Sequence, residues 1–258
     1  MLVVAGIALL AVWALYAYRP AAEPTIRIAA AADLKFALDE LVAEFRRQHP
    51  QITVKISYGS SGSFFAQLFQ RAPFDMFFSA DMDYPQRLIV HGLALAETAF
   101  FYAVGRIVLW VPKSSAIAVE QRGVQALFDP TVKKIALANP QHAPYGRAAV
   151  AALKSLGVYE AVHERFVFGE NVAQAAQFVQ SGAAQIGVIA LSLALAPTLR
   201  AHGRFWEFPL ASYPRMEQGG VILKWVRDRA SAELLKNFVL SEQGRAILKN
   251  YGFFLPGE

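Results

Sequence analysis

Residues 25–63, TIRIAAAADLKFALDELVAEFRRQHPQITVKISYGSSGS, contain the pattern that decides the fold. The segment begins with a short apolar run, TIRIAAA, which predicts a buried strand. From Asp33 onward, apolar residues recur at helical spacing until His49-Pro50 ends the helix. A second strand pattern, TVKISYG, then leads into a Ser/Gly turn that opens another helix. Strands and helices in alternation are typical of an α/β fold.

The alternation continues through the rest of the chain and predicts two α/β lobes. We expect the chain to cross between them twice, near residues 103–106 and 214–219, because GGVILKW predicts a strand that returns to the first lobe. Such lobes leave a cleft that opens and closes by a hinge motion. The predicted segments are a signal peptide or membrane anchor over 1–24, the first part of lobe 1 over 25–103, lobe 2 over 104–216, and the return segment of lobe 1 over 217–258.

The composition excludes several classes of protein. Of 258 residues, 55% are hydrophobic and 17% charged, so the chain can bury a core and is not intrinsically disordered. Cysteine is absent, which removes disulfide scaffolds, thiolate metal sites and thiol nucleophiles. The net charge of +5 is scattered, with Arg46-Arg47 and Lys133-Lys134 as its adjacent basic pairs, so we expect no nucleic-acid partner.

The N-terminal segment indicates export. Residues 1–18 contain no charged side chain, and the first charge is Arg19. The apolar run fits either a cleaved signal, although its basic start is missing, or an uncleaved anchor slightly shorter than a full membrane span. Both alternatives place the chain from about Thr25 onward outside the cytoplasm.

Strand-to-helix turns are the candidate ligand site. In an open α/β sheet such turns gather at the carboxyl ends of the strands, and each helix start presents unpaired N–H donors with a partial positive charge. Several of them together form an anion site without lysine or arginine. Four turns qualify, two in each lobe: Ala32-Asp33, Ser60–Ser63, Ala143–Gly146 and Glu170–Val172.

Structural roles are the alternative for the same side chains. Ser60, Ser61 and Asn171 are residue types that cap helix starts, and Asp33 is equally an ordinary N-cap. A carboxylate beside an anion would repel it unless the side chain turned toward its own helix. Tyr145 could be a packed aromatic residue.

Catalytic and metal-binding patterns are sparse. The five histidines are far apart, so no local pair of metal ligands exists. Ser61 with His142 is a conceivable nucleophile and base, but no G-x-S-x-G elbow surrounds the serine and no third member is evident. No Walker or G-x-G-x-x-G motif is present. We expect neither an enzyme nor a cofactor.

Six segments together resemble a known family, the periplasmic molybdate-binding proteins that supply molybdate or tungstate to an ABC permease. They are IAAAADLKFALDEL, YGSSGSFFAQL, APFDMFFSAD, NPQHAPYG, FGENVAQAAQFVQSGAAQIGVIALS and SEQGRAILKNYGF. The resemblance implies a two-lobed type II periplasmic binding-protein fold whose cleft holds a tetrahedral oxyanion through backbone N–H groups and neutral hydroxyls. It also implies a periplasmic location, permease subunits as partners and, we expect, a monomer.

Carried over by position, the resemblance implies seven ligand contacts: Ala32, Asp33, Ser60, Ser61, Ala80, Tyr145 and Val172. Two positions depart from the family pattern. Relatives often have Ser or Asn where this chain has Asp33, which puts the side-chain contact there in doubt. Some relatives have a binding tyrosine where this chain has Ala190, and the Tyr145 hydroxyl is the candidate replacement.

Other ligands and functions stay open. A protonated oxyanion such as phosphate needs a buried acceptor, and Asp33 is the only acid among the seven positions, so a receptor for phosphate or sulfate is the alternative. Porphobilinogen deaminase uses a similar fold but attaches its cofactor through a cysteine, which is absent here. A regulator's effector domain would need a helix-turn-helix segment where the apolar N-terminus lies.

Overall fold

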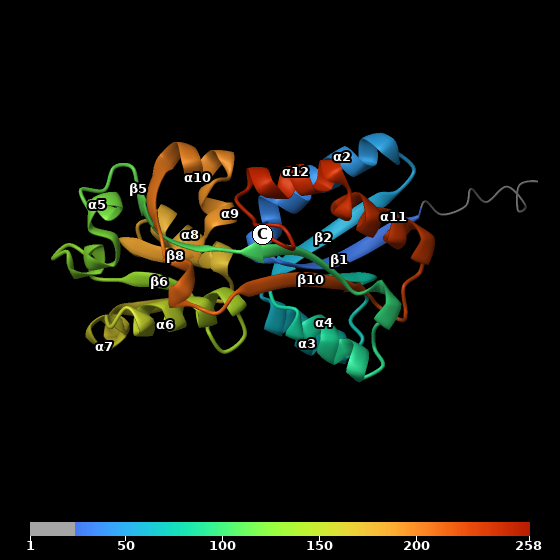
Figure 1. Ribbon diagram of the computed structural model, residues 1–258, viewed down its shortest axis with the longest axis horizontal. Helices are drawn as coiled ribbons and strands as arrows, with labels where there is room; N and C mark the ends of the chain where they lie inside the picture. The colour runs from blue at the N-terminus through green and yellow to red at the C-terminus, as the bar shows by residue number, and fades with distance from the viewer. Residues whose placement is uncertain (1–23) are drawn as a thin grey trace, which may run out of the picture.

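The computed structural model describes residues 24–258, so the predicted signal or anchor over 1–24 lies almost wholly outside the described residues. The chain forms two lobes side by side, each built on a five-stranded sheet (Figure 1). The predicted two-lobed α/β fold is therefore confirmed. In the part of the chain that the structure describes, no helix is long and apolar enough to cross a membrane.

The sheet of lobe 1 has the order β2-β1-β3-β10-β4. β1 pairs in parallel with β2 and β3, and β10 runs antiparallel between β3 and β4. Its strands are β1 (Thr25–Ala31), β2 (Thr53–Gly59), β3 (Met76–Ser79), β4 (Phe100–Gly105) and β10 (Met216–Ile222).

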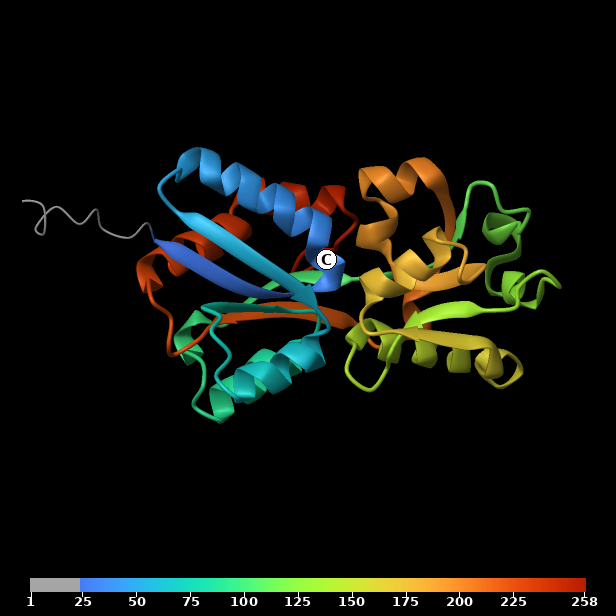
Figure 2. The ribbon, with the colours of Figure 1, turned by 180° about the vertical axis from the view of Figure 1, so that it is seen from behind.

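Helices cover both faces of this sheet, with α2, α11 and α12 on one side and α3 and α4 on the other (Figures 1 and 2). Each layer has its own buried core, exemplified by Leu38 and Leu41 of α2 on one face and Leu68 of α3 on the other. The helices are α2 (Lys35–Gln48), α3 (Ser61–Phe69), α4 (Asp83–Val90), α11 (Arg229–Leu240) and α12 (Glu242–Asn250), with 3-10 turns η1 (Ala32–Leu34) and η2 (Ala96–Thr98).

Lobe 2 repeats the design with the strand order β7-β6-β8-β5-β9. Its strands are β5 (Ile107–Pro112), β6 (Ile135–Ala138), β7 (Phe166–Gly169), β8 (Ile186–Ala190) and β9 (Gly203–Glu207). Its helices are α5 (Val119–Arg122), α6 (Pro144–Ser155), α7 (Tyr159–Val162), α8 (Val172–Gln180), α9 (Leu191–Ala194) and α10 (Pro197–His202), with 3-10 turns η3 (Gly123–Phe128), η4 (His163–Arg165) and η5 (Leu210–Ser212).

The chain crosses between the lobes twice. At the first crossing, Arg106 alone separates β4 of one sheet from β5 of the other. At the second, residues 208–215 lead from β9 to β10, so the predicted crossing near 214–219 lies too late in the chain. The strand that resumes lobe 1 begins at Met216, because the backbone of MEQ already pairs with β4.

Candidate functional site

All seven predicted contact positions line one cavity between the lobes: Ala32, Asp33, Ser60, Ser61, Ala80, Tyr145 and Val172. β1, β2 and β3 end at this cavity from lobe 1, and the starts of α6 and α8 reach it from lobe 2. The arrangement follows from the parallel pairing of the strands, whose carboxyl ends meet at one edge of a sheet. About 10 Å³ is open to the centre of a water molecule, which is room for about one water.

The start of α3 leaves one hydroxyl directed at the cavity. Ser60 is the N-cap and accepts a hydrogen bond from the Ser63 N–H, which confirms its capping role. Ser61 is fully buried, and its Oγ accepts from the N–H of Ala80 at 3.0 Å. Because a hydroxyl that accepts one bond keeps its own proton, Ser61 remains a donor, while the N–H of Ala80 is used within the protein.

The starts of α6 and α8 each leave a single first-turn N–H for a ligand. Asn171 caps α8 by accepting from Ala173 and Gln174, so the N–H of Val172 is the remaining donor in that turn. At α6, proline at the first position has no N–H, and the next donor is that of Tyr145. The Asn171 cap at α8 and Pro144 at α6 thus each leave one N–H donor at the cavity.

Asp33 does not cap a helix, contrary to that interpretation of the sequence. The 3-10 turn that contains it, η1, has Ala31 as its N-cap residue and no side-chain cap, and the Asp33 carboxylate instead faces partners from distant parts of the chain. Its Oδ2 accepts from the Tyr145 hydroxyl at 3.0 Å and from Gln218 Nε2 at 2.8 Å. Asp33 is 1% exposed, and its Oδ1 has no hydrogen-bond partner.

The network behind Asp33 is made of neutral groups. Gln218 Nε2 also donates to the Tyr145 hydroxyl, and the Tyr102 hydroxyl lies within hydrogen-bond distance of both the Ser79 carbonyl oxygen, at 3.0 Å, and Gln218 Oε1, at 3.2 Å. Across the lobes, Ser192 Oγ donates to the backbone carbonyl of Asp33 at 2.7 Å. Because one hydroxyl has one proton, Tyr145 cannot donate to Asp33 and to an anion at once.

Burial controls the ionisation of this network. It raises the pKa of Asp33 from 3.8 to about 6, against the lowering effect of the hydrogen bonds from Gln218 and Tyr145 and of the nearby backbone N–H groups of Asp33 and Leu34, which lie outside hydrogen-bond geometry. Burial, and then the nearby carboxylate, also raise the pKa of Tyr145 and Tyr102 well above the ordinary value. Both phenols therefore stay protonated donors at neutral pH.

Direct contacts hold the lobes together on the α3 side of the cavity. Glu170 of lobe 2 accepts from the hydroxyls of Ser60 at 2.9 Å and Ser63 at 2.8 Å. Although partial burial acts to raise the pKa of Glu170, these hydrogen bonds and one from Asn171 bring it below the ordinary value. The N–H of Gly62 donates to the His142 carbonyl at 2.8 Å.

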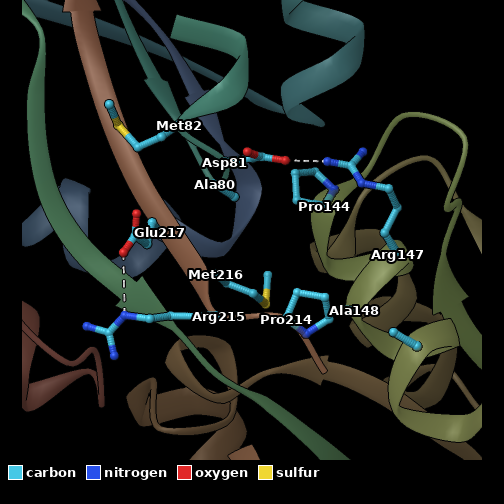
Figure 3. A pocket seen from close by; sticks show the side chains of 11 residues that line it. Ala80, Asp81, Met82, Pro144, Arg147, Ala148, Pro214, Arg215, Met216 and Glu217 are labelled. Carbon is cyan, nitrogen blue, oxygen red and sulfur yellow. Dashed lines mark hydrogen bonds and ion pairs between the residues drawn. The ribbon is translucent and has the colours of Figure 1, made fainter. Parts of the chain in front are cut away.

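An ion pair spans the outer part of the cleft. Asp81 of lobe 1 and Arg147 of lobe 2 point toward one another across a pocket of about 510 Å³ (Figure 3). This pocket shares Ala80 and Pro144 with the smaller cavity and is bounded by the second crossing at Pro214. It forms the outer section of the same cleft.

The conceivable nucleophile and base are not arranged for catalysis. The Ser61 hydroxyl is bonded to Ala80, whereas the His142 ring nitrogen Nε2 lies 3.1 Å from the carbonyl oxygen of Glu170. Within residues 24–258, no group of three or more His, Cys, Asp or Glu side chains is placed to hold a metal ion.

Most of the described chain matches one family. A model of the family described as bacterial extracellular solute-binding protein matches residues 26–254. The chain belongs to this family. Like its other members, this solute-binding protein has two lobes around a cleft, and the fold is that of the type II periplasmic binding proteins.

Molybdate-binding proteins are among the relatives of this chain. The chain is 32% identical to molybdate-binding protein ModA of Rhodobacter capsulatus, over 91% of this chain and 90% of the relative. It is 34% identical to the Azotobacter vinelandii protein of the same name, over 89% and 90%. The solved structure of the Azotobacter vinelandii periplasmic molybdate-binding protein superposes with a TM-score of 0.83 at 33% identity, covering 90% of this chain and 99% of that one.

Several residues that shape the site were not predicted. The sequence contained one signal for Gln218, because it is an isolated amide in the buried strand MEQGGVI and a buried amide needs hydrogen-bond partners. Ser192, Asp81 and Arg147 had none, because their roles depend on how the lobes face each other. Glu170 was included in a candidate turn, but its contact with α3 could not be inferred.

Proposed function

We propose that this solute-binding protein captures molybdate or tungstate in the cavity between its lobes and presents it to an ABC permease. The observation that carries the proposal is the gathering of the seven positions in one buried cavity. Among the residues described as lining it, none is lysine or arginine, and the donors are hydroxyls and first-turn N–H groups. Similarity to molybdate-binding proteins over about 90% of the chain supports this ligand class.

The energetics allow a tight complex. Charge-assisted hydrogen bonds contribute about 1.5 to 3 kcal/mol each, so the three free donors, the Ser61 hydroxyl and the N–H groups of Tyr145 and Val172, contribute about 4.5 to 9 kcal/mol, which reaches the micromolar range. Two of the helix starts that carry donors, those of α3 and α8, are fixed by the side-chain caps of Ser60 and Asn171. A ring of fixed donors favours the larger molybdate and tungstate over sulfate by distance.

The protein acts, in this proposal, as a receptor and not as an enzyme. Lobes that touch around the bound anion present a surface different from separated lobes, which is what a permease can recognise. The proposal includes export to the periplasm, an N-terminal signal or anchor, action as a monomer and no cofactor.

A second candidate ligand is phosphate. Asp33 Oδ1 is a buried oxygen acceptor without a hydrogen-bond partner, in a residue that lines the cavity, and a protonated anion could donate to it. This observation does not favour sulfate, which brings no proton at neutral pH.

Calorimetric titration of residues 25–258 with molybdate, tungstate, sulfate and phosphate tests the proposal. We expect one-to-one binding of molybdate and tungstate at least tenfold tighter than of the other two anions. Preference for phosphate would replace the proposed ligand, and no binding of any of the four would reject the receptor function.

A further inference from the structure

We propose that Asp33 makes anion capture proton-linked, so that the cleft takes up the oxyanion together with one proton held between Asp33 Oδ1 and an oxygen of the anion. The inference rests on the proposed function and deepens it. It assigns to Asp33 a role in ligand selection, and it predicts a pH dependence that a cavity of neutral donors alone would not have.

The two oxygens of the Asp33 carboxylate have different surroundings. Oδ2 accepts two hydrogen bonds, from the Tyr145 hydroxyl and Gln218 Nε2, which fix the side chain in place. Oδ1 is buried and has no hydrogen-bond partner, although Asp33 lines the cavity. A buried carboxylate oxygen without a partner is rare, because desolvation is then not offset. A proton shared with a ligand would give Oδ1 the missing hydrogen bond.

The groups that face Asp33 do not neutralise its charge. Tyr145 comes from α6, Tyr102 from β4, Gln218 from β10 and Ser192 from α9, and all four side chains are neutral at neutral pH. At the start of α8 the nearest acid is Glu170, which its own hydrogen bonds keep ionised.

Cations on the neighbouring elements are paired elsewhere. On α2, Lys35 pairs with Asp39, and Arg147 on α6 pairs with Asp81. Burial, with no charged side chain among the main influences, raises the pKa of Asp33 to about 6. No described cation therefore stands ready to offset a second negative charge beside this carboxylate.

A dianion and a carboxylate in contact would repel each other strongly at this depth. Uptake of one proton removes one unit of the negative charge and converts the repulsion into a hydrogen bond. The balance is simple: molybdate dianion, one proton and the protein give a complex with the proton between the two oxygens. At a pH above the pKa of Asp33 the proton comes from solvent, whereas dihydrogen phosphate brings its own.

The sign of the pH effect follows. Binding that takes up one proton weakens about tenfold for each unit of pH above the pKa of Asp33 in the free protein. From about pH 7 to about pH 8.5, the molybdate affinity of the wild type should therefore fall about 30-fold. Molybdate remains the same dianion over this range, so the change belongs to the protein.

Titration calorimetry with sodium molybdate in two buffers of different ionisation enthalpy, each at about pH 7 and about pH 8.5, measures the proton count directly. We expect uptake of about one proton per anion at the higher pH. In Asp33→Asn the uptake should fall to near zero and the affinity should become independent of pH. The amide can still accept from Tyr145 while its NH₂ donates to the anion, so binding itself should persist.

Two further variants keep the result interpretable. His142→Gln removes the imidazole at the cleft without touching Asp33 and should retain the proton uptake of the wild type. Asp33→Ser exchanges the carboxylate for a smaller polar group. It serves as the test variant if Asp33→Asn does not fold.

The outcomes separate this inference from the proposed function. Tight molybdate binding with no proton uptake in the wild type would overturn the role of Asp33 and leave the receptor function standing. Proton uptake that vanishes in His142→Gln but persists in Asp33→Asn would also overturn it. No binding of any oxyanion by the wild type would reject both.

Discussion

Gly62 at the start of α3 offers the sharpest test of how the lobes meet. A Cβ at this position would lie 2.6 Å from the His142 carbonyl oxygen and 2.9 Å from its Cα, both backbone atoms of the opposite lobe. Ordinary contact begins near 3.4 Å, so Gly62→Ala requires the lobes to stay about 0.8 Å further apart at this point. Within α3 itself, alanine is a better helix former than glycine by up to about 1 kcal/mol.

The cost of this separation can be worked out from the contacts that it breaks. The hydrogen bond from the Gly62 N–H to His142, now 2.8 Å, would be lost, at about 0.5 to 1.5 kcal/mol. About one charge-assisted bond to the anion from the facing lobe would be lost as well, at about 1.5 to 3 kcal/mol. The sum, about 2 to 4.5 kcal/mol, corresponds to an affinity reduced about 30-fold to about 2,000-fold.

Titration with molybdate and thermal unfolding of the anion-free protein are the two assays. Gly62→Ala should lose affinity without losing stability. The matched control is Gly157→Ala, where φ is +69° and nothing lies within 4 Å of the added Cβ. That change should lower stability by about 1 kcal/mol through backbone strain and leave affinity unchanged. Wild-type affinity in Gly62→Ala would refute the inference that binding requires the lobes to meet as described.

Three other predictions concern the cavity and the cleft. Ser61→Ala should weaken molybdate binding by about 1 to 3 kcal/mol with a small effect on unfolding, and a folded variant of unchanged affinity would remove Ser61 from the site. Asp81 and Arg147 are 33% and 41% exposed, so their ion pair should contribute little to closure of the cleft. A double-mutant cycle on anion affinity with Asp81→Asn and Arg147→Gln should give a coupling energy of about 0 to 1 kcal/mol. A coupling energy above about 2 kcal/mol would mean that the pair is a main contact that holds the lobes closed. The pKa of Asp33 rises from 3.8 to about 6 on burial, so its contribution to stability is full below about pH 4 and is lost as the pH rises through about 6. Asp33→Asn should abolish that loss, so its free energy of unfolding without anion, measured with denaturant at pH 7, should exceed that of the wild type by up to about 3 kcal/mol. Identical dependence of the unfolding free energy on pH in the two proteins would contradict this.

Local sequence signals were sufficient for the central strands and the helix caps. TIRIAAA and TVKISYG coincide with β1 and β2, because apolar runs bounded by clear breaks leave little choice of structure. Ser60 and Asn171 cap their helices as predicted, since capping depends only on the next few residues. β9, GRFWE, was missed because a half-buried edge strand at the end of α10 has no such pattern.

Asp33 shows where sequence reasoning stops. Its capping preference is local, but the partners that hold its carboxylate are 112 and 185 positions away, on α6 and β10. Two hydrogen bonds within a buried network outweigh one exposed cap. The seven positions that the family resemblance implies all line the cavity, yet the resemblance did not reveal that the Tyr145 proton is directed at Asp33.

The most direct test is a crystal structure of the protein grown with molybdate, with anomalous diffraction recorded at the molybdenum edge. We expect a single molybdenum peak in the cavity between Ser61 and Val172, with an anion oxygen in hydrogen-bond contact with Asp33. A peak in the outer pocket beside Asp81 and Arg147, or none in the cleft, would contradict the assignment of the site.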